Sequence, residues 1–171
     1  MRVPNLRVIA AALTVSTAGL SFLANHEGFT TKAVIPIPGD RPTYGYGSTF
    51  KADGTPVKMG DRISEPEARK LLNTTLKDKY QKGIHQCAGD IPMHQYEFDA
   101  LVDAAYNLGV WTVCKSGMVR HFRVGEYEKG CQFFLKYKYA AGKDCSLPES
   151  KCMGVWKRRL AQVELCKGEA K

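Results

Sequence analysis

The stretch HEGFTTKAVIPIPGDRPTYGYGST, residues 26–49, holds the features that decide the fold. Glu27 lies at its start, and sixteen residues later Thr43 opens a run in which tyrosines alternate with glycines. Successive side chains of a strand point to opposite sides, so Thr43 should stand on a face that Gly45 and Gly47 leave bare. Glycines weaken strands and commonly mark the close approach of a ligand. This pattern predicts a strand that forms the floor of a binding cleft.

An acid and a hydroxyl face each other if Glu27 begins a helix opposite this strand. Such a pair is the minimum needed to protonate the leaving oxygen of a glycosidic bond and to position a water molecule. A sugar chain would fit the bare floor, and Tyr46 in the same run is expected to contact it. The nearest second carboxylate is Asp40, in the turn at residues 38–42. A catalytic role and a turn-forming role through its own backbone are both open for Asp40.

Outward from this stretch, the sequence predicts a small β lobe followed by a helical lobe. Residues 43–49 and 55–57, on either side of the turn at 51–54, indicate a β-hairpin. Ser64 and Glu67 form a capping box that opens a helix through residue 81, long and charged enough to bridge two lobes. The fold class is therefore α+β and mainly helical. Apolar residues at helical spacing predict a helix within residues 93–109 that stops at Gly109, and further helices are expected around 116–123, 126–139 and 154–166.

Length and charge restrict the class of protein. The 171 residues fit one globular domain with an appendage, and 44% hydrophobic with 25% charged residues excludes disorder and a multi-span membrane protein. A net charge of +8 favours an anionic partner such as nucleic acid, an acidic membrane or a cell-wall polymer, although a merely soluble basic surface is the simpler alternative. Nucleic acid is not expected, because no recognition motif accompanies the charge.

Residues 8–24, VIAAALTVSTAGLSFLA, are uncharged, and Arg2 and Arg7 precede them. As a helix they would extend about 25 Å, the short end of what crosses a bilayer core. Their many small residues make insertion weak. A cleaved signal peptide, a permanent anchor and an amphipathic helix of the folded domain are three interpretations of this segment. We expect export, because the cysteines agree with it.

The six cysteines are even in number and lie in the carboxy-terminal half of the chain. No Cys-x-x-Cys or paired Cys/His pattern of a zinc site occurs, so disulfides in an oxidising compartment are the better interpretation than a metal site or buried thiols. A small ring closed by Cys145 and Cys152 is expected. Spacing leaves the other connections open, and our working hypothesis joins Cys87 to Cys114 and Cys131 to Cys166.

Five motifs follow one another along the chain: His26-Glu27-Gly28, the run at residues 43–47 (TYGYG), residues 95–101 (QYEFDAL), residues 106–109 (YNLG) and residues 156–159 (WKRR). In this order, from about residue 25 to the end, they resemble the phage-type lysozymes of glycoside hydrolase family 24, the endolysins.

The resemblance implies a lysozyme-like two-lobed fold and a muramidase. Such an enzyme cuts the β-1,4 bond between N-acetylmuramic acid and N-acetylglucosamine in peptidoglycan and releases phage by host cell lysis. Glu27 would be the general acid, and Thr43 would hold the attacking water. Asn107 and Arg158 match positions near the catalytic glutamate and are expected to bind substrate, with Arg159 as the alternative match. A helix-end amide and a solvated basic helix are the structural alternatives for these residues.

One departure from the family concerns the second carboxylate, which members usually carry nine residues after the glutamate and six before the threonine. Here the interval is one residue longer, so those counts arrive at Pro36 and Ile37. Neither side chain can act as a base. A lytic transglycosylase is therefore the alternative enzyme, because the sugar's own 6-hydroxyl attacks and one acid suffices. A non-catalytic module that binds cell wall through its basic surface is the alternative from another class.

The resemblance also extends to secreted endolysins with a signal-arrest-release amino terminus. It predicts a signal-anchor segment over residues 1–24 and a catalytic domain over residues 25–171. The protein would be exported, held in the host inner membrane through residues 8–24 on the periplasmic side, and then released to the periplasm. We expect a monomer that acts on peptidoglycan glycan strands without a metal or cofactor.

Overall fold

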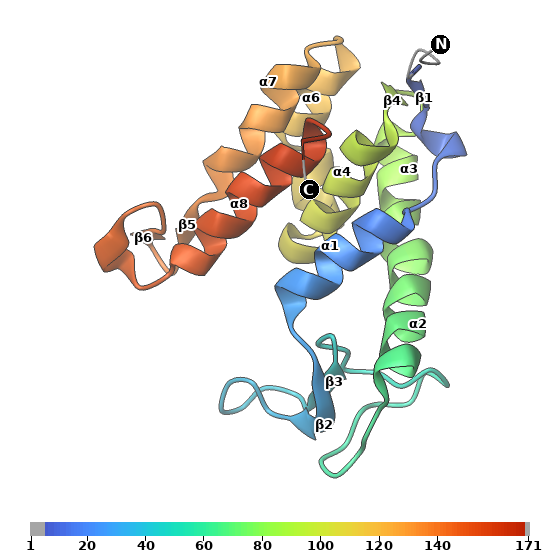
Figure 1. The fold of residues 1–171 in the computed structure, drawn as a ribbon, viewed down its shortest axis with the longest axis vertical. Helices are drawn as coiled ribbons and strands as arrows, with labels where there is room; N and C mark the ends of the chain where they lie inside the picture. The colour runs from blue at the N-terminus through green and yellow to red at the C-terminus, as the bar shows by residue number, and fades with distance from the viewer. Residues whose placement is uncertain (1–5, 170–171) are drawn as a thin grey trace.

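In the computed structural model, which describes residues 6–169, a long helical run joins a small β lobe to a larger helical lobe (Figure 1). The run consists of α2 (Glu65–Thr75), the π-helical turn η2 (Leu76–Gln81) and α3 (Lys82–Ala88). Its predicted capping box is present, because Glu67 Oε2 accepts hydrogen bonds from the backbone nitrogen and the hydroxyl of Ser64 at 3.0 and 2.5 Å. The helical run thus joins the two lobes, as expected from the sequence.

The small lobe is built on an antiparallel pair, β2 (Thr30–Val34) and β3 (Thr43–Gly45). The predicted hairpin around residues 51–54 is present but short: Val57 donates to the backbone oxygen of Thr49 at 2.9 Å, and Phe50 and Pro56 form an isolated bridge. The first part of the predicted strand, Thr43–Gly45, pairs with β2 instead. Strand β2 was not predicted, because only one of its five side chains is buried and its sequence therefore lacks a clear alternation.

The expected alternation also ends at Gly45, whose φ of +60° is in the left-handed region. A Cβ atom there would lie 2.9 Å from the Cβ of Ala68 on α2. Tyr44 and Tyr46 are both buried, as expected of side chains on one covered face. Gly45 is therefore required by the turn of the chain and by the packing of α2. Gly45 and Gly47 also line the cavity described below, so the ligand floor that the sequence suggested stays a prediction.

The helical lobe is organised around α4 (Gln95–Leu108), nine of whose fourteen residues are buried. Helices α1 (Thr17–Glu27), α5 (Val110–Cys114) and α8 (Met153–Cys166) pack against it. Truncating one large side chain of such a core to alanine typically costs about 2–5 kcal/mol. The largest core side chains, all at most 1% exposed, are Phe98, Leu101, Met118, Phe122 and Phe134.

Most of the remaining helices lie close to their predicted ranges, apart from α5 and the helix expected over 126–139. Helix α6 (Gly117–Arg123) and α8 match their predicted ranges within one residue, whereas α5 was not predicted. The helix expected over 126–139 is α7 (Tyr127–Gln132) followed by the 3-10 turn η3 (Phe133–Tyr137). The chain then turns back in the hairpin formed by β5 (Tyr139–Ala140) and β6 (Lys143–Asp144), and a last 3-10 turn, η4 (Pro148–Ser150), precedes α8.

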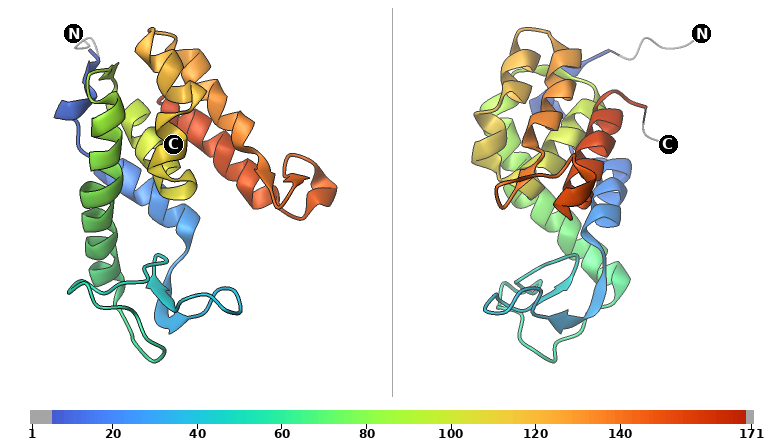
Figure 2. Two further views of the ribbon diagram at one scale, coloured as in Figure 1. Left: turned by 180° about the vertical axis from the view of Figure 1, so that it is seen from behind. Right: turned by 90° about the vertical axis from the view of Figure 1, so that its left-hand side faces the viewer.

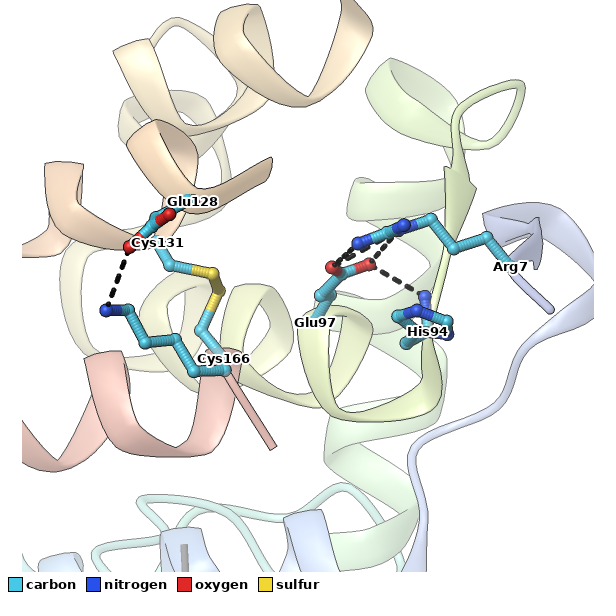
Figure 3. Close-up of a disulfide and its surroundings, with 7 residues drawn as sticks. Arg7, His94, Glu97, Glu128, Cys131 and Cys166 are labelled. Carbon is cyan, nitrogen blue, oxygen red and sulfur yellow. Dashed lines mark hydrogen bonds and ion pairs between the residues drawn. A yellow bond between two sulfur atoms is a disulfide. The ribbon is translucent and has the colours of Figure 1, made fainter. Parts of the chain in front are cut away.

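Three disulfides join the pairs that our hypothesis proposed, and Figure 3 shows the second of them. The first ties α3 to α5, the second ties α7 to α8, and the third closes a ring of seven residues' separation just before α8. Disulfides typically stabilise a domain by about 2–4 kcal/mol each, mainly by restricting the unfolded chain. The pairs are Cys87–Cys114, Cys131–Cys166 and Cys145–Cys152.

Residues 7–16, called the amino-terminal strap, run across the helical lobe before α1. Strand β1 (Val8–Ile9) pairs with β4 (Pro92–Met93), and a 3-10 turn η1 (Ala10–Ala12) follows. Arg7 donates to both carboxylate oxygens of Glu97 at 2.8 to 3.3 Å, as Figure 3 shows. Within residues 6–169, none of the helices has the length and apolar character needed to cross a bilayer.

Candidate active site

Glu27 is the last residue of α1, not the first residue of a helix as we expected. The helix ends here because Gly28 follows with a φ of +70°, which is unfavourable for other residues. Eight of the eleven residues of α1 precede residue 25. The domain boundary expected after Ala24 therefore falls inside α1. The position of Glu27 depends on how the earlier turns of α1 are held.

Asp99 of α4 fixes the start of α1. Its Oδ2 accepts from the hydroxyl of Ser16 at 2.5 Å, and its Oδ1 accepts from the Ser16 backbone nitrogen at 3.0 Å. The same Ser16 oxygen caps the helix by accepting from the backbone nitrogen of Gly19. Burial raises the pKa of Asp99, opposed by the hydrogen bonds from Ser16 and Gln95. The helix that ends at Glu27 thus begins on a buried carboxyl of the core.

Arg158 of α8 contacts the carboxylate of Glu27. Its Nη1 donates to Glu27 Oε1 at 2.5 Å, and its Nη2 donates to Asp103 Oδ1 at 2.8 Å. Asp103 is 1% exposed and Arg158 8%. Burial by itself would lower the pKa of Arg158, but the two carboxylates outweigh it and raise that pKa. Arg158 therefore lies charged between Glu27 and a buried aspartate.

Arg159, the next residue of α8, has different hydrogen-bond partners. Arg159 donates to the amide oxygen of Asn107 and, from Nη1, to Gln162 Oε1 at 2.6 Å. Gln162 in turn donates to Asp103 at 2.6 Å. Burial and the charge of Arg158 lower the pKa of Arg159 to about 10. Of the two arginines that the sequence left open, Arg158 contacts Glu27, and Arg159 holds Asn107.

Tyr106 connects the two lobes beside Glu27. Its hydroxyl donates to the backbone oxygen of Tyr46 at 3.0 Å, and its ring packs on Tyr80 of η2 with 5.0 Å between centroids. Burial, and then the negative charge of Glu27, raise the pKa of Tyr106. The phenol of Tyr46 is buried and donates to Glu65 at 3.2 Å. Tyr46 thus presents its backbone to this region, while its ring supports the small lobe.

A cavity of about 540 Å³ lies between the β3 turn and the helical run, and Tyr106 borders it. Its walls combine backbone of the glycine-rich turn, the aromatic rings of Tyr80 and Tyr106, and the polar side chains of Thr75 and Asp78. Glu27 does not line this cavity, but its charge acts on Tyr106 at the cavity's edge. A ligand that extended from Glu27 past Tyr106 would enter it.

Thr43 and Asp40 do not line that cavity. Thr43 is half-buried, lies opposite Val34 in the strand pair, and makes no side-chain hydrogen bond to the rest of residues 6–169. Asp40 is exposed, and its backbone nitrogen donates to the oxygen of Ile37 at 2.9 Å in a turn. Pro36 and Ile37, the two positions at which the sequence comparison expected a carboxylate, are exposed, and neither side chain is a carboxylate.

Asp103 and Gln162 were missed by sequence reasoning. A signal existed for the first, because Asp99 and Asp103 stand four residues apart within the otherwise apolar stretch 98–105 of this helix. Buried carboxylates require charged or hydrogen-bonding partners, so two at this spacing indicate two partners from other elements. The described residues hold no group of three or more His, Cys, Asp or Glu side chains that could bind a metal ion.

Comparison with known sequences finds the Phage lysozyme family, which matches residues 24–162. The endolysin of Bacillus phage B103 is 31% identical over 132 residues, which are 77% of this chain and 48% of that protein. The endolysin of Salmonella phage P22 is 30% identical over 132 residues, which are 77% of this chain and 88% of that protein. The chain thus spans about half the length of the first relative and most of the second.

Solved structures share the fold. An endolysin from Escherichia coli O157:H7 phage FAHEc1 superposes with a TM-score of 0.74 at 25% identity, over 91% of this chain and 94% of that one. The active form of the P1 phage endolysin Lyz gives 0.67 at 20% identity, over 90% and 85% of the two chains. The secreted inactive form of the same protein gives 0.51 at 18% identity, over 91% and 96%.

Proposed function

The chain belongs to the phage lysozyme family, and on that premise we propose that it is an endolysin muramidase that hydrolyses the β-1,4 bond between N-acetylmuramic acid and N-acetylglucosamine. The observation that carries the proposal is Glu27 at the end of α1, oriented by Arg158. The substrate is the glycan strand of peptidoglycan, and the enzyme works as a monomer outside the cytoplasm.

Glu27 is the general acid. Arg158 occupies Oε1, whereas Oε2 accepts no hydrogen bond from the described residues, so Oε2 is the oxygen that carries the proton to the leaving group. Asp103 keeps Arg158 in place while that proton is gained and lost.

Thr43 positions the attacking water. Its hydroxyl makes no hydrogen bond to the described residues, so both its donor and its acceptor sites are open to a water molecule. The exposed Asp40 shapes its turn. Asn107, held by Arg159, and the backbone of Tyr46 border the path of the glycan, which continues into the cavity beside Tyr106.

Product analysis tests this mechanism. Mass spectrometry of a peptidoglycan digest should show muropeptides with reducing ends. A lytic transglycosylase is the second candidate, favoured by Pro36 and Ile37 at the family's carboxylate counts, and it would leave 1,6-anhydro sugars instead. A protein that only binds wall would release no soluble fragments.

The amino-terminal segment is a signal-arrest-release element that holds the exported protein in the inner membrane before it acts. Residues 8–24 are uncharged and rich in small residues, and arginines precede them. While they lie in the bilayer, α1 cannot form on Asp99, and Glu27 cannot meet Arg158.

Leucine substitutions at exposed positions test release without disturbing packing. Gly19 is unsuitable, because a Cβ atom there would lie 2.6 Å from Asp99. Ala12→Leu with Ala18→Leu should retain the protein in the membrane fraction after an uncoupler is added and should delay lysis, whereas serine at both positions should not. Wild-type protein found trimmed after Ala18, or soluble in the periplasm before depolarisation, would contradict this element.

A further inference from the structure

Residues 138–152, called the disulfide hairpin, contain β5, β6 and the ring closed by Cys145 and Cys152. One ion pair within it is internal. Lys138 Nζ contacts Asp144 Oδ2 at 2.6 Å, and the hydrogen bonds from Lys138 and Ser146 lower the pKa of Asp144 to about 2. The catalytic network described above uses no side chain of this hairpin.

Two further lysines of the hairpin remain available to a ligand. Lys143 and Lys151 are exposed and form no ion pair with the rest of residues 6–169. Glu149, also exposed, is the one other acid of the hairpin. Lys136 and Lys157, just outside its two ends, are exposed too. The surface around the hairpin is therefore cationic.

Both ends of the hairpin are anchored at the wall of the active site. At one end, the backbone oxygen of Tyr137 accepts from Arg159 Nε at 3.0 Å. At the other, Cys152 directly precedes α8, and Arg158 follows six residues later, about 9 Å along the helix. Figures 1 and 2 show the hairpin projecting from the end of α8 toward the same side as the loop between β2 and β3.

The backbone of the hairpin is constrained. Ala141 and Lys151 have φ values of 47° and 60°, a conformation that residues other than glycine adopt only where the surroundings impose it. Lys151 lies within the ring that the Cys145–Cys152 disulfide closes. Beside the lysines, Tyr139 is 62% exposed and Leu147 47% exposed, which supplies apolar surface next to the charges.

From these features we infer that the disulfide hairpin is a second binding surface for the substrate. Lys143 and Lys151 bind carboxylates of the stem peptide while the glycan occupies the site at Glu27. The inference rests on the proposed function, because the peptide branches from the N-acetylmuramic acid units of the same strand. An acidic peptide beside the cleft fits these lysines, whereas the N-acetylglucosamine units of the glycan offer them no negative charge.

The test compares two substrates with one pair of variants. Two substrates are each digested by wild type and by Lys143→Glu with Lys151→Glu. One is intact peptidoglycan, and the other is glycan strands freed of peptide by an amidase, with the lactyl carboxylates that the amidase exposes converted to methyl amides. On intact peptidoglycan the double variant should raise KM about tenfold with little change in kcat. On peptide-free strands its kinetics should equal those of the wild type.

Two controls make the comparison specific. Lys143→Arg with Lys151→Arg should keep wild-type KM, since charge is retained. Lys70→Glu with Lys77→Glu makes the same charge change on exposed residues of the interlobe helical run and should leave the ratio between substrates unchanged. Thermal unfolding checks that each variant is folded.

An equal effect of the hairpin variant on both substrates, or no effect on either, would overturn the inference while leaving the muramidase intact. If the wild type cleaved neither substrate, the proposed function would fail and the inference with it. These results are distinguishable, because wild-type cleavage is measured in the same assay.

Discussion

Glu27 and Arg158 are joined by an Nη1 to Oε1 contact of 2.5 Å, although 131 residues separate them. The contact brings the end of α1 to α8, and both helices pack on α4. The side chain of Arg158 is 9% exposed and that of Glu27 21%, so one of the two charges is nearly buried and the other is partly exposed to solvent. An acid that is held through one carboxylate oxygen and is partly exposed to solvent suits proton transfer to a bound substrate.

Glu27→Gln should reduce wall-clearing activity by at least about a hundredfold, because the amide has nearly the same shape but no proton to donate. Turbidity clearing of purified peptidoglycan measures the loss. The melting temperature should change little, since Arg158 keeps its bonds to Asp103. A variant that retains more than a few per cent of activity would move the acid role elsewhere.

Asp103→Ala should lower the free energy of unfolding by about 3–5 kcal/mol, because it leaves Arg158 and Gln162 buried without their acceptor. Asp90→Ala is the matched control, since Asp90 also pairs with an arginine but on the surface. It should cost about 0–1 kcal/mol. Urea denaturation of both variants gives the comparison, and equal losses would show that the buried network adds nothing.

Thr43→Ala should lower kcat far more than Asp40→Asn does, provided that Thr43 holds the water and Asp40 only shapes its turn. Turnover is measured on peptidoglycan at equal concentrations of folded protein. The reverse order would assign the second catalytic role to Asp40.

Asp99 should produce a stability change with a defined sign. Its pKa in the folded state is raised above the ordinary value of 3.8, so the stability that it contributes is complete below that value and is lost as pH rises through the folded pKa. The melting temperature of the wild type minus that of Asp99→Asn should therefore fall as pH increases from about 3.5 to 7.

Asp144→Asn is the control of opposite sign. The folded pKa of Asp144 is lowered to about 2, so its contribution is present above the ordinary value of 3.8 and is lost as pH falls toward 2. A wild-type minus Asp99→Asn difference that rose with pH would contradict the assignment of Asp99 as a carboxyl destabilised by burial.

Much of the fold was predictable because it depends on local signals. The capping box at Ser64 and the apolar spacing of α4 are set by residues close together in the sequence. The disulfides were indicated by the even number of cysteines in the whole chain. Strand β2 and helix α5 were not predictable in this way. Strand β2 has one buried side chain, and α5 has five residues, too few for a periodic pattern.

The candidate site was predictable where it follows a motif and not where it depends on packing. Glu27 and Arg158 were identified from motifs, but the partner that separates Arg158 from Arg159 is Asp103, on a third helix. The bounds of α1 were mistaken, because residues 8–24 have one uniform composition and Glu27 was expected to begin a helix, not to end one. Only the tertiary contact between Ser16 and Asp99 marks where helix begins within them.

The placement of α1 across residue 24 has a practical consequence for producing the enzyme. Leader segments are routinely replaced by a purification tag, and here that replacement would remove the Ser16 cap together with Leu23 and Ala24, which are 1% and 3% exposed. The tagged product would keep every catalytic side chain of the motif yet lack the turns that carry Glu27. A tag belongs at the carboxyl terminus of this chain.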